Sequence, residues 1–310
     1  MLKIFKIAGV AMEIRAVLLA GLASVAFVSG ARAQSFCYGS SCASDSAITL
    51  NGGNAGASAS ATSSTIALTN NTAFDYGSVA SANTFALGTS FSTSFNFQVN
   101  TSDDCVNSLP AGCSKANANG FAFVLSTAPS SNGASNSNFG IGTGAGTSVD
   151  LVFGTFANKN NAPGGSSNYV GLTEDGNTNF SQSPTTGNAY GISNCTSAST
   201  KSAAVTTAGC LANGDIWTAS IKLVNNLLTV TLSDPKETGS SAVLTETFNV
   251  ASYLGTGNVY LGFTSSGGAA WEQVNISNWT ASSNAVPEPA SIAGVGAGLM
   301  ALGLLRRRKA

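Results

Sequence analysis

Histidine is absent from this 310-residue chain, and charged residues make up only 9% of it. Without histidine, the Ser-His and Cys-His arrangements that activate a nucleophile cannot form. The chain also lacks a strand motif that would carry the carboxylate pair of a glycosidase. We therefore expect no enzymatic activity and no catalytic residues. A hydrolase would need the fold to bring two distant carboxylates together, such as Glu246 and Glu272.

Positive charge is scarce between residues 34 and 283. This stretch has no arginine, and its five lysines against twelve acidic residues give a net charge of −7. The formal charge of −1 for the whole chain hides this, because eight of its thirteen basic residues lie in the two ends. Nucleic-acid binding requires a basic surface that neutralises phosphates, so the composition excludes nucleic acid as a partner.

The N-terminal end is typical of a secretory signal peptide. Lys3, Lys6 and Arg15 precede an apolar run over residues 16–28. After this run, Ala31-Arg32-Ala33 forms a small-residue cleavage site. We expect residues 1–33 to be the leader of an exported protein. The leader is long when counted from Met1, so Met12 remains an alternative start.

The C-terminal end, residues 284–310, contains Val286-Pro-Glu-Pro289, an apolar stretch over 293–305 and a basic tail over 306–309. It resembles the PEP-CTERM sorting signal of Gram-negative bacteria that make exopolysaccharide. The resemblance implies processing by an exosortase-type machinery and transient membrane anchoring through the C-terminal segment. It also implies a location in the cell envelope, at the cell surface or outside the cell. The alternative is a weak permanent anchor, because the apolar stretch is short for a membrane span.

Six cysteines fall into three close pairs, Cys37/Cys42, Cys105/Cys113 and Cys195/Cys210. An even number of cysteines in an exported chain predicts disulfides. Three local loops are the simplest connectivity, but spacing alone leaves the other connectivities open. A metal site made of cysteines is disfavoured because the chain has neither a Cys-x-x-Cys motif nor histidine.

Alternating apolar residues predict β-strands through most of the body. The pattern is clearest at Phe91–Val99, where every second residue is apolar after Phe95, and in the pair 215–223 and 226–232, which predicts a hairpin turning at Val224-Asn225-Asn226. Further strands are expected at 121–125, 149–156, 168–172, 242–250, 259–264 and 273–280, with a short helical turn at 251–254. Segments 47–50 and 64–68 predict edge strands in a loose hairpin, with a low-complexity flexible segment as the alternative. Together these segments predict an all-β sandwich of about a dozen antiparallel strands.

Five segments resemble the legume-type (L-type) lectins and their bacterial relatives. They are Ala118-Asn-Gly-Phe-Ala-Phe123, Leu151-Val-Phe-Gly-Thr-Phe-Ala-Asn158, Asn168-Tyr-Val-Gly-Leu172, Val259-Tyr-Leu-Gly-Phe-Thr-Ser-Ser-Gly267 and Glu272 to Trp279. They follow one another in the order that the family shows. The resemblance implies a concanavalin-like β-sandwich (jelly roll) over residues 34–283 and a glycan or exopolysaccharide as the partner.

The family's sugar-binding positions can be carried over to this chain. They fall on Asn119, Gly140, Phe156, Asn158 and the last loop from Gly268 to Trp271. The family has Asp where this chain has Asn119, and Asn offers one acceptor and two N–H donors in place of acceptors alone. Asn119 is therefore expected to bind a sugar hydroxyl with a different pattern. Trp271 is either an exposed sugar contact or a packed side chain.

The family's Ca/Mn site is lost at the level of sequence. The resemblance places its ligands at Val152, Gly154, Asn158, Ala162 and Tyr169, of which only Asn158 matches. Hard cations need several oxygen ligands, usually with anionic charge. We therefore predict no metal and no cofactor. Asp175 begins an Asp-x-Asn-x-Asn run, but the run fails the remainder of the EF-hand pattern and indicates a solvated turn.

These observations predict an exported carbohydrate-binding lectin-like protein, associated with the cell surface or with extracellular polysaccharide. The alternative is a structural matrix or surface protein that uses the same sandwich without binding sugar. The two hypotheses differ in whether Asn119, Asn158 and Trp271 converge on an open site. The sequence leaves the glycan and the oligomeric state undetermined.

Overall fold

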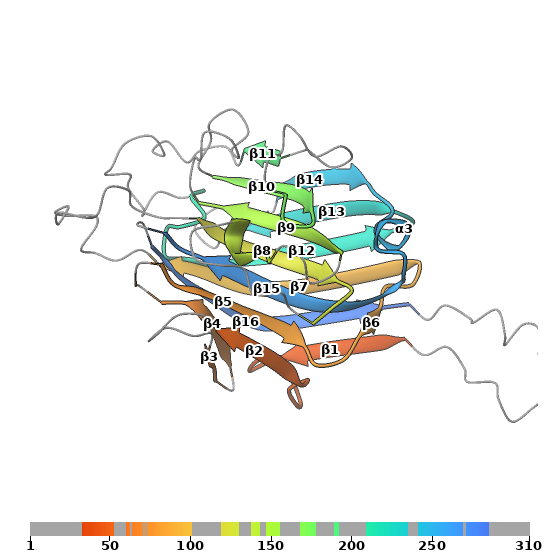
Figure 1. The fold of residues 1–310 in the computed structure, drawn as a ribbon, viewed down its shortest axis with the longest axis horizontal. Helices are drawn as coiled ribbons and strands as arrows, with labels where there is room; N and C mark the ends of the chain where they lie inside the picture. Colours follow the sequence, from red (N-terminus) through yellow and green to blue (C-terminus); the bar gives the residue numbers. More distant parts are fainter. Residues whose placement is uncertain are drawn as a thin grey trace, which may run out of the picture. The chain divides into compact units, whose positions relative to one another are not determined.

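The computed structural model describes residues 33–52, 60–62, 64–70, 72, 74–100, 119–129, 138–142, 147–155, 168–177, 189–191, 209–234, 241–268 and 271–284. The described residues from Gln34 to Asn284 belong to one compact unit. Within them, two eight-stranded antiparallel sheets account for nearly all regular structure (Figure 1). This confirms the predicted concanavalin-like sandwich. No helix in the described part is long and apolar enough to cross a membrane. Of the predicted leader (1–33) and sorting segment (284–310), only Ala33 and Asn284 are among the described residues.

One sheet, the back sheet, is built around the long strands β7 and β16. Its strands lie in the order β14 (Ser241–Thr247), β13 (Leu227–Ser233), β12 (Ile216–Val224), β7 (Ser90–Asn100), β16 (Gln273–Ser283), β4 (Thr65–Thr69) and β3 (Ser60–Ala61), and β1 (Gln34–Tyr38) also pairs with β16. Along β7, residues alternate between buried and partly exposed at every position. The sequence alternation therefore marks one face turned to the core and one turned to solvent.

The second sheet, the front sheet, carries the segments that resemble lectins. Its order is β11 (Ala189–Gly191), β10 (Tyr169–Glu174), β9 (Ser148–Gly154), β8 (Gly120–Ser126), β15 (Asn258–Ser266), β5 (Tyr76–Ser81) and β2 (Ile48–Gly52), and β6 (Phe85–Ala86) also pairs with β15. Every residue of β8, β9 and β10 is buried. These three strands are therefore covered on both faces, which explains their continuous apolar sequence.

Aromatic rings fill the space between the sheets. The Phe95 ring from β7 meets the Phe263 ring from β15 edge to face, with centroids 4.7 Å apart. The rings of Phe121 and Phe153 are stacked nearly parallel, with centroids 4.5 Å apart. All four are essentially inaccessible to solvent. Truncating one such ring to alanine typically costs ~3–5 kcal/mol, so these residues fix how the sheets pack.

The predicted hairpin is confirmed. Strands β12 and β13 pair from Val224↔Leu227 onward, and the two turn residues Asn225 and Asn226 have φ values of 49° and 67°. Asparagine tolerates this left-handed conformation better than most residues, and such a turn matches the twist of the strands. The expected helical turn is also present as α3 (Val250–Leu254), capped by the Asn249 side chain.

The predicted N-terminal hairpin is wrong. Residues 47–50 contribute to β2, which pairs with β5 in the front sheet, while residues 64–68 contribute to β4, which pairs with β16 in the back sheet. The two segments therefore do not pair with each other, although β4 also pairs with the short neighbouring strand β3. Alternation predicts a strand but not its neighbour, so local pattern could not reveal that the chain crosses from one sheet to the other here.

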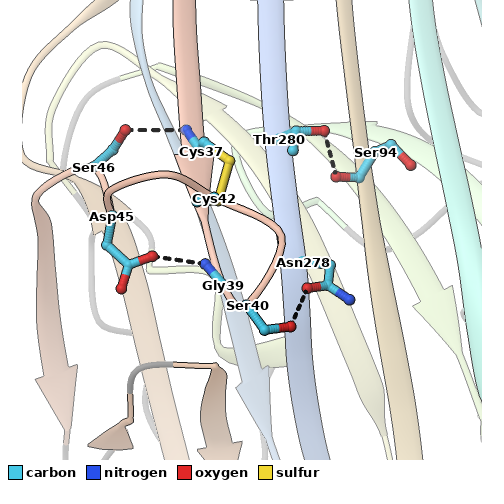
Figure 2. Close-up of a disulfide and its surroundings, with 9 residues drawn as sticks. All are labelled: Cys37, Gly39, Ser40, Cys42, Asp45, Ser46, Ser94, Asn278 and Thr280. Atoms are coloured by element: carbon cyan, nitrogen blue, oxygen red, sulfur yellow. Dashed lines mark hydrogen bonds between the residues drawn. A yellow bond between two sulfur atoms is a disulfide. The ribbon is translucent and has the colours of Figure 1, made fainter.

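The first and last strands of the sandwich, β1 and β16, lie side by side (Figure 1). Gln34 at the start of β1 is paired with Ser283 at the end of β16. Close to this edge, Cys37 and Cys42 form a disulfide that closes a tight loop (Figure 2). The Asp45 side chain accepts a hydrogen bond from Gly39 N at 2.9 Å, and Ser40 Oγ donates to Asn278 Oδ1 at 3.1 Å. The loop is thus fastened to the back sheet at the bulge in β16.

The other predicted disulfides are only partly covered by the structure. Cys210 is buried and disulfide-bonded. Cys105, Cys113 and Cys195 lie outside the described residues. The first local loop, Cys37–Cys42, is therefore confirmed, and the pairing of the other four cysteines stays a prediction.

Candidate functional site

Asn119 lies at the end of the front sheet where three strands meet. Its backbone N–H donates to Ser266 O of β15 at 3.3 Å, and its carbonyl accepts from Thr155 N, just past β9, at 3.2 Å. The backbone of Asn119 is therefore held from both sides. Its side-chain Nδ2 is 3.5 Å from Ser266 O, a weak contact, and its Oδ1 accepts no hydrogen bond from a described residue. The half-buried amide keeps most of its hydrogen-bonding capacity for a ligand.

Gly140 approaches the same segment from a different loop. It closes the short 3-10 helix η1 (Asn138–Gly140) with a φ of 76°. A Cβ on this residue would lie 2.6 Å from the carbonyl oxygen of Ser265, which is too close for any other side chain. Glycine is thus needed for the loop to rest on β15 beside the residue that pairs with Asn119.

The last loop begins at Gly267 and Gly268 and returns to β16 through Trp271. Gly268 is buried, and its carbonyl accepts from Phe74 N at 2.9 Å. Trp271 is partly exposed, and its Nε1 is buried without a hydrogen-bond partner among the described residues. The sequence left open whether Trp271 is exposed or packed, and in the structure its side chain is partly packed and partly accessible to solvent.

The structure brings four of the six predicted sugar-site residues to one end of the sandwich. Asn119, Gly140, Gly268 and Trp271 all lie on or beside the segment from Ser265 to Glu272. Phe156 and Asn158 lie outside the described residues, but the chain reaches Thr155 at this same end, where it bonds to Asn119. We call the end formed by Asn119, Gly140, Gly268 and Trp271 the loop end.

Glu272 forms a buried anchor under the loop end. It is 2% exposed, and Thr155 Oγ1 lies 2.9 Å from each of its carboxylate oxygens. Burial raises its pKa from 4.5 to about 7, although hydrogen bonds from Thr155 and from the backbone of Gly120 lower it. The Glu272 carboxyl therefore links Gly120, which follows Asn119 in the chain, to Thr155, whose backbone N–H donates to the carbonyl of Asn119. The sequence alone could not reveal this anchor, because the partners of Glu272 are Gly120 in β8 and Thr155 just past β9.

Glu272 does not form a glycosidase pair with Glu246. Glu246 is on β14, and β13, β12 and β7 separate that strand from β16. Four strand spacings amount to about 19 Å, which is well beyond the ~5–9.5 Å between the carboxyl groups of glycosidases. The fold therefore does not bring together Glu246 and Glu272, the pair that the hydrolase hypothesis named.

The positions of the family's metal ligands do not fit a metal. Val152 and Tyr169 belong to an apolar cluster on the outer face of the front sheet, completed by Ala122, Val124, Phe139 and Ile141. We call this group the outer cluster. A Cβ at Gly154 would lie 2.2 Å from Cζ of Tyr169, so the tyrosine ring fills the space beside this glycine. Burial raises the pKa of Tyr169 and keeps it neutral. Asn158 and Ala162 lie outside the described residues.

Asp175 at the opposite end of β10 acts as a turn residue. Its Oδ1 accepts from Ser148 N at 2.7 Å, and its Oδ2 accepts from the Tyr253 hydroxyl at 2.9 Å. Neighbouring Asp150 is fully buried, and burial raises its pKa to about 7. No group of three or more Cys, Asp or Glu side chains in the described part is placed to hold a metal ion.

Solved structures of lectins match this two-sheet fold. The basic lectin of winged bean, in complex with Tn-antigen, has a TM-score of 0.60 and 18% identity over 81% of this chain and 98% of its own. A Bauhinia forficata lectin in complex with GalNAc has a TM-score of 0.58 and 21% identity over 82% and 99%. Arcelin-5, a lectin-like defence protein from Phaseolus vulgaris, has a TM-score of 0.55 and 18% identity over 82% and 99%.

The sequence itself carries the family assignment. The model of the legume lectin domain matches residues 33–295, so the chain belongs to the legume lectin domain family. The PEP-CTERM protein-sorting motif matches residues 285–309 and points to export and a location in the cell envelope or at the surface. No curated protein sequence matches the chain significantly.

Proposed function

We propose that this exported lectin-like protein binds carbohydrate without covalent chemistry at its loop end, and that it associates with the cell surface or with extracellular polysaccharide. The observation that carries the proposal is the amide of Asn119. Its backbone is fixed from both sides while its Oδ1 accepts no hydrogen bond from a described residue. A fixed amide with spare acceptors and donors suits the paired demands of sugar hydroxyls.

The site is proposed to work without a metal ion. In L-type lectins the metal fixes the loop that bears the sugar-binding Asn. Here the Tyr169 ring packs on Gly154 at the end of β9, and Glu272 binds Thr155 one residue later. These two contacts hold the strand end from which residues 156–158 continue, so they supply the rigidity that a bound ion would otherwise supply.

The described chain leaves the sandwich at the end of β16 that lies farthest from the loop end. Strand β16 begins just after Trp271 and Glu272 and ends at Ser283, 11 residues along. At ~3.4 Å per residue this separates the two ends of β16 by roughly 34 Å. Attachment through the C-terminal tail, processed by an exosortase-type machinery, therefore starts far from the proposed sugar contacts.

Binding rather than catalysis is the proposed activity, and the fold family is non-enzymatic in general. The second candidate is a structural surface protein. The observation in its favour is the outer cluster, which replaces the family's metal ligands with apolar side chains. A sandwich that had lost sugar binding would keep this stable packing but would have no need for the open amide at Asn119.

A glycan array separates the two functions. The purified protein is expected to bind a restricted set of saccharides, and Asn119→Ala is expected to abolish that binding while leaving thermal unfolding unchanged. Asn96→Ala, on the solvent face of β7 in the back sheet, is the matched control and is expected to bind as the unchanged protein does. Absence of selective binding by the unchanged protein would support the structural function instead.

A further inference from the structure

Phe74 is an exposed aromatic residue at the loop end that no lectin motif assigns to sugar binding. Its side chain is 45% exposed. The other large apolar side chains exposed in the described part are Leu50, Ile216, Val224 and Leu227, all of them aliphatic. The chain has sixteen phenylalanines, and nearly all those described are buried in the core. The exposure of the Phe74 ring is therefore unusual among the described phenylalanines.

The backbone of Phe74 adopts an unfavourable conformation. Its φ is 61°, in the left-handed region that bulky residues rarely occupy. Such conformations persist where the surroundings impose them, and they cluster at ligand-binding sites. In this protein two backbone hydrogen bonds impose the conformation: Phe74 N donates to Gly268 O at 2.9 Å, and Gly267 N donates to Asp75 O at 2.7 Å. The last loop of the candidate site thus holds Phe74 in place.

Asp75 also stabilises the turn that carries Phe74. It is 2% exposed, and its Oδ2 accepts from Asn70 N at 2.7 Å. Burial raises the pKa of this carboxyl, while hydrogen bonds from the backbone of Asn70 and Tyr76 lower it. The turn that carries Phe74 is therefore bonded both to the last loop and to the residue that follows β4, so the ring is attached to a well-defined backbone.

Strand register places Phe74 at a useful distance from Asn119. Strand β15 lies between β5 and β8, Tyr76 is paired with Ser266, and Asn119 N bonds to Ser266 O. Phe74 and Asn119 therefore flank the end of β15, two strand spacings or about 10 Å apart. That separation exceeds one sugar ring and matches the reach of two linked sugar units.

We propose that Phe74 is a stacking platform for a second sugar unit, next to a first unit held by Asn119. The ligand class is then an uncharged saccharide of two or more units. The C–H groups on one side of a pyranose ring pack against the negative face of an aromatic ring. The net charge of −7 over residues 34–283 disfavours a polyanionic ligand. This inference rests on the proposed function, because it adds a second contact to the same site.

Titration calorimetry with matched saccharides tests the inference. A neutral disaccharide selected on the array and its constituent monosaccharide are titrated into the full chain and into Phe74→Ala. Loss of the ring is expected to weaken disaccharide binding roughly tenfold and to leave monosaccharide binding within about twofold. Phe74→Trp is expected to preserve disaccharide binding. Leu227→Ala, equally exposed at 45% on β13, is expected to change neither affinity.

A second variant separates stacking from folding. Glycine accepts a positive φ without cost, so Phe74→Gly removes the ring and also relieves the backbone. It is expected to unfold at the same or a higher temperature while losing disaccharide affinity as Phe74→Ala does. Equal affinities of the unchanged protein, Phe74→Ala and Phe74→Gly for the disaccharide would overturn the inference. An equal loss for mono- and disaccharide would also overturn it. Failure of the unchanged protein to bind any saccharide would instead overturn the proposed function.

Discussion

Replacing Glu272 by glutamine is expected to make the protein more stable at neutral pH and to reduce the dependence of its stability on pH. In the folded protein, burial raises the pKa of Glu272 from 4.5 to about 7, against the lowering effect of Thr155 and Gly120. The unfolded chain ionises this group near its ordinary pKa. The raised pKa therefore contributes stability that is complete below about pH 4.5 and is lost as the pH rises through about 7. A rise of this size corresponds to about 3 kcal/mol.

The assay is urea unfolding at pH 5 and pH 8, followed by tryptophan fluorescence, since Trp217 and Trp279 are buried. The unchanged protein is expected to be several kcal/mol less stable at pH 8, because Asp150 also has a pKa raised to about 7 by burial and adds to the loss. Glu272→Gln is expected to shrink the difference between the two pH values by about 2.5 kcal/mol, because part of the effect is already lost at pH 5. Glu246→Gln, on the partly exposed strand β14, is the control and is expected to leave it unchanged. An undiminished difference in Glu272→Gln would refute the reasoning.

Three further predictions follow from the packing. Tyr169→Ala empties the space beside Gly154 and is expected to cost ~3–5 kcal/mol in urea unfolding, while Tyr169→Phe should cost about 1 kcal/mol or less; a small effect of the alanine would mean that the outer cluster does not brace the sheet. EDTA and added Ca²⁺ are each expected to leave the melting temperature unchanged in calorimetry, because Val152, Gly154 and Tyr169 offer no cation site, and a rise with Ca²⁺ would contradict this. Cys37→Ser, which opens the loop closed with Cys42, is expected to lower the free energy of unfolding by about 2 kcal/mol, and equal stability with and without a reductant would argue against such a contribution.

Local sequence pattern predicted the strands because each has one face in the core. Phe95, Phe97 and Val99 recur at every second position of β7, and all three are buried as that spacing requires. The turn at Asn225-Asn226 was equally local, since both residues tolerate a positive φ. The separation of β2 and β4 into different sheets was not predictable in this way, because strand partners are chosen by contacts far apart in the chain.

The candidate site was predictable in outline but not in its supporting contacts. The lectin motifs pointed to Asn119, Gly140, Gly268 and Trp271, and the fold brings these four to one end. The motifs also showed that metal ligands are missing, but not that the Tyr169 ring takes the space beside Gly154. Phe74 gave no signal at all. Its exposure and its positive φ arise from hydrogen bonds to the last loop, which only the folded chain displays.

A metal-free sugar site is tested most directly by titrating one array-selected saccharide in EDTA and again in Ca²⁺. The unchanged protein is expected to bind with the same affinity in both buffers, and Asn119→Ala is expected to lose binding in both. The expectation follows from a site that is held by Glu272 and Tyr169 rather than by an ion. Binding that disappears in EDTA and returns with Ca²⁺ would contradict the central claim, since it would show that sugar binding depends on a metal ion.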